Sequence, residues 1–161
     1  MKTNWTKLIQ DAHAWAHASQ PYELVLGPSA STHDLDITEN KLGIQFPKEF
    51  RDLYKVHNGF GYSDQNGNEF WAFLPLKNLP EFIEKVRYFI EDLFPDEAQR
   101  FFPFFDWQDG GGAGYLLNRK GKLRQGLYDF HPEHVSESYR EMGGFLFEPS
   151  DKNIRKFLSS R

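Results

Sequence analysis

Two aspartates beside a glycine-rich segment come nearest, of all the residues in this chain, to a catalytic arrangement. Asp106 and Asp109 flank Trp107, and the glycine-rich segment 110–114 follows directly. Glycoside hydrolysis uses one carboxyl group as acid and a second as base or nucleophile, so this pair beside an aromatic ring could act on a sugar. Acidic and aromatic side chains also suit a contact with a basic protein, which is the interpretation that we favour.

Two pairs of histidines raise the question of a metal site. His13 and His17 are four residues apart, a spacing that can place two ligands on one helix face, but the intervening residues lack the glutamate of the H-E-x-x-H motif. His131 and His134 form a looser pair around a proline. Neither pair has an identifiable third ligand, so we expect ordinary solvated or hydrogen-bonded imidazoles and no metal.

Two loops resemble ligand-binding motifs and depart from them at decisive positions. Asp64, Asn66 and Asn68 mimic the first ligands of a calcium loop, but Pro75 stands where the closing glutamate belongs. The segment 110–114 lacks the Lys-Ser/Thr pair of a phosphate-binding loop and is expected to be a flexible turn between strands. We therefore expect no cofactor.

Composition excludes several classes of protein. The chain has no cysteine, which rules out disulfides and thiolate chemistry, and its net charge of −4 argues mildly against direct binding of nucleic acid. The N-terminus has no apolar signal core, and no window is apolar enough for a membrane span. These features predict a cytoplasmic protein without membrane contact. They do not predict its oligomeric state.

Hydrophobic periodicity predicts an α+β fold over residues 1–161, as a single domain. Its central, mainly antiparallel twisted sheet would have helices packed around it. The expected helices cover 2–19, 31–43, 47–57 and 80–93, with a last one capped by Ser150. The expected strands are 22–26, two hairpins within 60–74 and 115–128, and 101–107. In the helix 80–93 the predicted inward stripe is Phe82, Ile83, Val86, Phe89, Ile90 and Leu93.

The segment 31–59 carries a pattern of caps, stops and apolar positions. Its residues are Ser31, Leu35, Glu39, Leu42-Gly43, Phe46-Pro47, Phe50 and Asn58-Gly59. This pattern resembles the opening motif of the SUKH superfamily, which includes the yeast Smi/Knr cell-wall-assembly regulator. Later segments resemble the family in the same order: 73–76, 109–111 and 153–158. The resemblance covers 29–158, and 1–28 would add an N-terminal helix and a short strand.

The resemblance implies a protein-binding module without catalytic residues. Many bacterial members are immunity proteins that bind and neutralise polymorphic toxins, often nucleases, and this is the function that we expect. Two alternatives stay open: a regulatory adaptor of the cell-wall-assembly-regulator type, and a small hydrolase or carbohydrate-binding protein.

The residues that we expect to contact a protein partner, a toxin domain, combine aromatic anchors with acidic groups. The acidic ones include one face of the helix 80–93, whose residues could equally be a solvated surface. The predicted contact residues are Trp71, Glu84, Glu91, Asp92, Asp106, Trp107 and Asp109.

Overall fold

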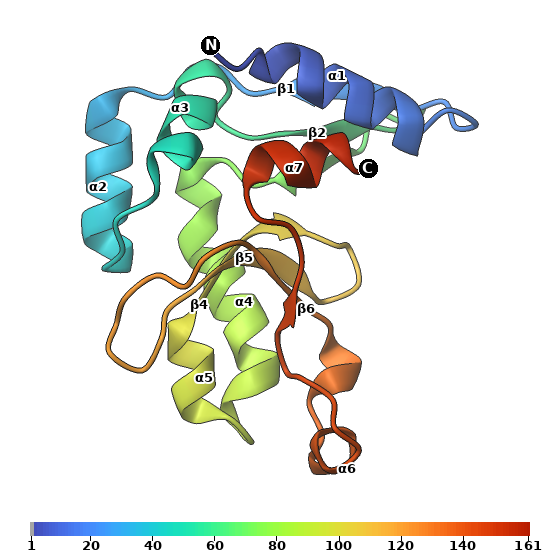
Figure 1. Ribbon diagram of the computed structural model, residues 1–161. Helices are drawn as coiled ribbons and strands as arrows, with labels where there is room; N and C mark the ends of the chain where they lie inside the picture. The colour runs from blue at the N-terminus through green and yellow to red at the C-terminus, as the bar shows by residue number, and fades with distance from the viewer. Residues whose placement is uncertain (1) are drawn as a thin grey trace. The chain divides into compact units, whose positions relative to one another are not determined.

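The computed structural model describes residues 2–161 (Figure 1). The chain divides into two compact units. The first contains residues 2–77 and 153–161, and the second contains 78–152. That the whole chain is one domain stays a prediction.

The first unit combines four helices with three antiparallel strands. Its helices are α1 (Trp5–Ala16), α2 (Thr32–Leu42), α3 (Lys48–Val56) and α7 (Ile154–Ser159). Its strands are β1 (Glu23–Leu26), β2 (Phe60–Ser63) and β3 (Glu69–Phe73). A 3-10 turn, η1 (Leu76–Asn78), follows and ends at the first residue of the second unit. β2 pairs with β1 on one side and β3 on the other, and α7 packs along α1 (Figure 1).

The predicted signals around α2 act as expected. The Ser31 hydroxyl accepts a hydrogen bond from Asp34 N, and the Asp34 carboxylate accepts one from Ser31 N, which completes a capping box. Gly43 ends the helix in the left-handed conformation at φ 73°. Behind it, the rings of Phe46, Phe50 and Tyr54 stack in the core.

The second unit packs helices against four antiparallel strands. Its helices are α4 (Leu79–Glu91), α5 (Pro95–Arg100) and α6 (Glu137–Glu141), with a 3-10 turn, η2 (Pro132–His134). Its strands are β4 (Phe101–Asp106), β5 (Gly112–Leu116), β6 (Tyr128–Phe130) and β7 (Glu148–Pro149), and each pairs antiparallel with the next. α4 packs on both α5 and β4. The α+β class with antiparallel strands is therefore confirmed.

Three local predictions are wrong, each for a physical reason. The last helix is capped by Asn153, whose side chain accepts from Lys156 N, because Ser150 lies four residues before Ile154 and its hydroxyl instead donates to Asp151. Gly112 and Gly114 belong to β5, where a Cβ on Gly114 would clash with the main chain of β4, so small residues are needed inside the strand. Phe89 and Leu93 are exposed, although the periodicity predicted them to face inward.

Among residues 2–161, no helix is both long and apolar enough to cross a membrane.

Candidate functional site

The outer face of α4 and the turn that follows it form an exposed surface of aromatic, aliphatic and acidic side chains. We call it the α4 surface. Its residues are Glu84, Tyr88, Phe89, Glu91, Asp92 and Leu93. Residues three, four and seven apart share a helix face, so Glu84, Tyr88 and Glu91 lie along one line.

The opposite face of α4 fixes this surface in place. Ile83, Val86 and Ile90 are buried. Arg87 lies at the edge, where its guanidinium donates to Phe101 O and Gln99 O and stacks 4.7 Å from the centre of the Phe102 ring. Burial lowers the pKa of Arg87. The helix is therefore anchored to β4 by both apolar packing and hydrogen bonds.

Large apolar side chains on the α4 surface face solvent. The exposed fractions are 71% for Tyr88, 42% for Phe89 and 49% for Leu93. The rings of Tyr88 and Phe89 meet edge to face, with centroids 6.1 Å apart. Single exposed apolar residues are ordinary, but neighbouring ones rimmed by charges are typical of a protein contact.

The carboxylates of the α4 surface outnumber the exposed cation of the helix, Lys85, and the charge of Glu84 also acts on the half-buried Arg87. Within residues 2–161, neither Glu84, Glu91 nor Asp92 forms an ion pair, whereas the next acidic side chain, Asp96, pairs with Arg100 at 3.2 Å. These three predicted contact residues therefore leave negative charge beside exposed aromatic groups.

The turn 106–111 borders the α4 surface. A Cβ on Gly110 would come within 3.6 Å of the Phe89 ring, so the two segments adjoin. Within the turn, Asp106 Oδ1 accepts from Gln108 N at 2.7 Å, and Asp109 Oδ1 accepts from Gly111 N at 2.8 Å. The two predicted catalytic candidates thus each use one oxygen to hold the main chain of their own turn.

Asp106 also lines a cavity of about 130 Å³ beside α4, together with Phe82 and Lys85. Burial raises the pKa of Asp106, and the charge of Asp109 adds to the effect, while the bond from Gln108 N and the charge of Lys85 oppose it. The cavity is smaller than the roughly 300–1,000 Å³ of typical small-molecule sites.

Trp107 is held by partners on its own unit. Its indole Nε1 donates to Asp129 at 3.3 Å, and its ring meets that of Phe105 edge to face at 4.7 Å. Asp109 Oδ2 lies 3.5 Å from His131 Nδ1. Trp71 lies on β3 in the first unit, whereas the other six predicted contact residues belong to the second unit.

Sequence reasoning missed the aromatic part of the site. The helical periodicity does not single out Tyr88, and it predicts that Phe89 and Leu93 face the core, whereas all three are exposed. A detectable signal was the width of the apolar stripe: α4 has more large apolar positions than one buried face can hold, so some must face solvent.

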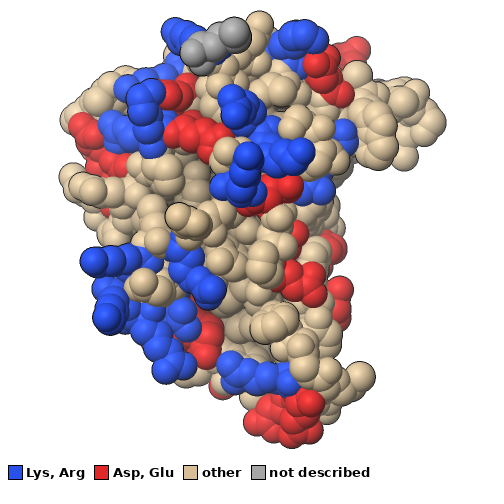
Figure 2. All heavy atoms as spheres, viewed as in Figure 1, with Lys and Arg blue, Asp and Glu red and all other residues tan. Residues whose placement is uncertain are grey.

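A basic hairpin on the second unit contrasts with the α4 surface. Four exposed cations lie between β5 and β6, and Figure 2 shows Lys and Arg gathered there at the left of the view. Asn118 Oδ1 accepts from Lys120 N and Lys122 N, which organises the turn. These cations are Arg119, Lys120, Lys122 and Arg124. Charge is therefore segregated on this unit.

The other candidate motifs have structural roles. Asp64 accepts bonds from the Asn68 amide, from Asn68 N and from Asn66 N, which closes the β2–β3 loop and lowers the pKa of Asp64. The rings of His13 and His17 lie 4.7 Å apart, and burial, followed by the charge of His13, lowers the pKa of His17. The part of the chain that the structure describes has no group of three or more side chains placed to hold a metal ion.

The motif residues of the segment 31–59 stabilise the fold. Glu39 accepts from Phe46 N at 2.7 Å and pairs with Arg51, which fixes the connection between α2 and α3. Asn58 Oδ1 accepts from Leu76 N at 2.8 Å. Structural roles were predicted for these positions, and the contacts agree.

The fold and the α4 surface together define an α+β protein with an exposed apolar and acidic helix face. The family model described as SMI1 / KNR4 family (SUKH-1) matches residues 29–155, and the chain belongs to this family. No curated protein matches the chain significantly.

Proposed function

We propose that this chain is a non-enzymatic protein-binding module that acts as an immunity protein, neutralising a cognate bacterial toxin. Membership of the SUKH-1 family supports a binding role, because the family resemblance implies protein binding and, for many bacterial members, neutralisation of a toxin. The observation that carries the proposal is the α4 surface, with three exposed apolar side chains beside three carboxylates that form no ion pair within residues 2–161.

The apolar side chains would supply most of the affinity. Aromatic residues near the centre of an interface lose water on binding and dominate its energetics. Tyr88 and Phe89 are held on a helix whose buried face is anchored, so little ordering is needed before a partner docks. We place both residues at the centre of the contact.

The carboxylates would select the partner. Glu84, Glu91 and Asp92 complement a basic protein face, such as the nucleic-acid-binding face of a nuclease toxin, and speed its association. The basic hairpin on the same unit would repel that face and so help to orient the complex.

Inhibition in this mechanism is stoichiometric. The α4 surface covers the substrate-binding face of the toxin, and no bond is made or broken. The chain would act as long as the complex lasts, so a slow dissociation rate is the property that matters.

Co-expression tests this function. The chain is expressed with the toxin candidate found among the products of its neighbouring genes, and growth and co-purification are measured. We expect restored growth and a complex of one copy of each protein. A toxin that remains lethal and does not co-purify would contradict the proposal and favour a regulatory adaptor.

A further inference from the structure

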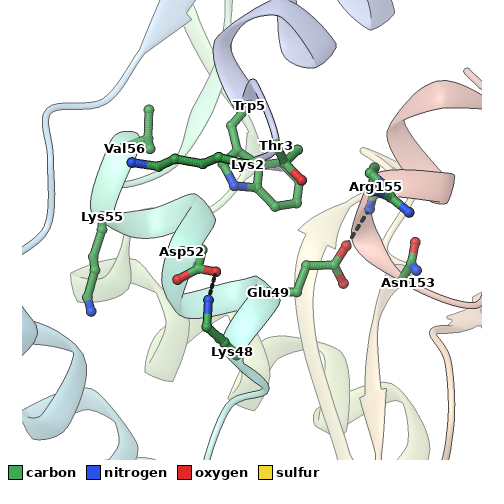
Figure 3. Close-up of a pocket in the computed structure, with 10 residues that line it drawn as sticks. All are labelled: Lys2, Thr3, Trp5, Lys48, Glu49, Asp52, Lys55, Val56, Asn153 and Arg155. Carbon is green, nitrogen blue, oxygen red and sulfur yellow. Dashed lines mark hydrogen bonds and ion pairs between the residues drawn. The ribbon is translucent and has the colours of Figure 1, made fainter.

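A hollow on the first unit is open to solvent and has a volume of about 700 Å³. It lies between the start of the chain, α3 and the beginning of α7 (Figure 3). Trp5 and Val56 contribute its apolar part. The volume falls within the roughly 300–1,000 Å³ typical of small-molecule sites.

The two carboxylates of the hollow are already occupied. Glu49 points to α7, where its oxygens accept from Ile154 N at 3.0 Å and Arg155 N at 2.7 Å (Figure 3). Asp52 pairs with Lys48 at 2.6 Å. Main-chain N–H groups are neutral, so Glu49 keeps its charge, and the four cations of the hollow exceed its two carboxylates by two positive charges.

Three cations of the hollow are not held in an ion pair by any carboxylate of the described residues. Within residues 2–161, Lys2, Lys55 and Arg155 form no side-chain ion pair. The side chain of Lys2 reaches across the hollow toward Val56 in Figure 3. Like charges around one concave surface concentrate a positive potential there.

Neutral side chains of the hollow supply further hydrogen-bond donors. The Asn153 oxygen accepts from Lys156 N at 2.8 Å, which leaves its amide hydrogens to donate, and Thr3 contributes a hydroxyl. The hollow is therefore rich in donors and short of free acceptors. A phosphate group matches this set better than a carboxylate, because it offers more acceptor oxygens and suits both an arginine fork and lysine charges.

We propose that this hollow binds a small phosphorylated ligand, with Lys2 and Lys55 as cationic contacts on the α3 side and Arg155 on the α7 side (Figure 3). The site lies in the first unit and does not depend on the proposed toxin contact. Such a site would make the protein bind a small molecule, a property that its family membership does not assign.

Inorganic pyrophosphate is the probe for this site, titrated into the full chain at low ionic strength by calorimetry. The test variant is Lys2→Gln with Arg155→Gln. The matched control is Arg119→Gln with Lys120→Gln, which removes the same charge from the basic hairpin. We expect saturable 1:1 binding, a Kd raised at least about tenfold in the test variant, and a Kd within about twofold of wild type in the control.

Three results would overturn the proposal: no saturable binding, equal weakening in both variants, or binding of succinate as tight as that of pyrophosphate. Thermal melting checks that each variant is folded. Lys55→Gln provides an independent second test and should also weaken binding. Growth rescue by the chain is unaffected by any of these results, so the two proposals are separable.

Discussion

Asn58 connects two distant parts of the first unit through one side-chain oxygen. That oxygen accepts from Leu76 N at 2.8 Å in a half-buried position. Asn58→Ala leaves this N–H unsatisfied, and we expect the free energy of unfolding to fall by about 1–3 kcal/mol. Urea denaturation measures it, with Asn40→Ala, an exposed position on α2, as control. Equal effects of the two substitutions would contradict the assigned role.

We expect the stability difference between wild type and an Asp106→Asn variant to depend on pH. Its pKa is raised in the folded state, chiefly by burial, so its stabilising contribution is present at low pH and lost as the pH rises through the folded pKa. Asp106→Asn removes the charge and keeps an acceptor for Gln108 N. We expect the Tm of the variant, relative to wild type, to rise between pH 3 and pH 7. A relative Tm that is constant or falls over this range would show that burial does not disfavour the charge.

At the scale of elements, we expect Glu49 and Asp52, both on α3, to contribute very differently to the stability of the protein. Glu49 accepts from two first-turn N–H groups of α7, whereas Asp52 forms an exposed i,i+4 pair with Lys48. Glu49→Ala should destabilise the protein by about 1–2 kcal/mol, as the loss of a helix cap does. Asp52→Ala should cost less than about 0.5 kcal/mol. Chemical denaturation compares them, and a larger loss for Asp52→Ala would refute the capping role.

The elements that could be predicted are those whose sequence signals act over only a few residues. The Ser31–Asp34 capping box and Gly43 act within a few residues, so α2 could be read directly. The cap of α7 depends instead on which hydrogen bonds Ser150 and Asn153 find in the fold. Phe89 fits the helical period yet faces solvent, because period alone does not say how wide a face is covered.

At the scale of the whole molecule, family and fold class were predictable, and the contact surface was predictable only in its charges. Glu84, Glu91 and Asp92 were identified from composition along one helix. The hydrophobic part could not be, since an aromatic side chain is equally at home in a core or an interface. Trp71 and Trp107 illustrate this, because both were predicted as contact residues and both are half-buried.

The negative charge of the α4 surface is expected to speed association with a basic partner. The variant Glu84→Gln, Glu91→Gln, Asp92→Asn removes three negative charges from the α4 surface. Its association rate with the toxin should fall by about tenfold or more at low salt and approach that of wild type at high salt. Stopped-flow mixing at several salt concentrations measures this. An association rate independent of both salt and substitution would exclude electrostatic steering.

The central claim is that the α4 surface binds the partner, and calorimetric titration of the chain with the toxin candidate used for co-expression tests it most directly. Tyr88→Ala with Phe89→Ala is compared with Trp15→Ala, a control that removes an aromatic side chain 73% exposed on α1. We predict that the double variant loses at least about 2 kcal/mol, roughly 30-fold in Kd, while the control binds like wild type. Tight 1:1 binding by a folded double variant, equal to that of the control, would contradict the account.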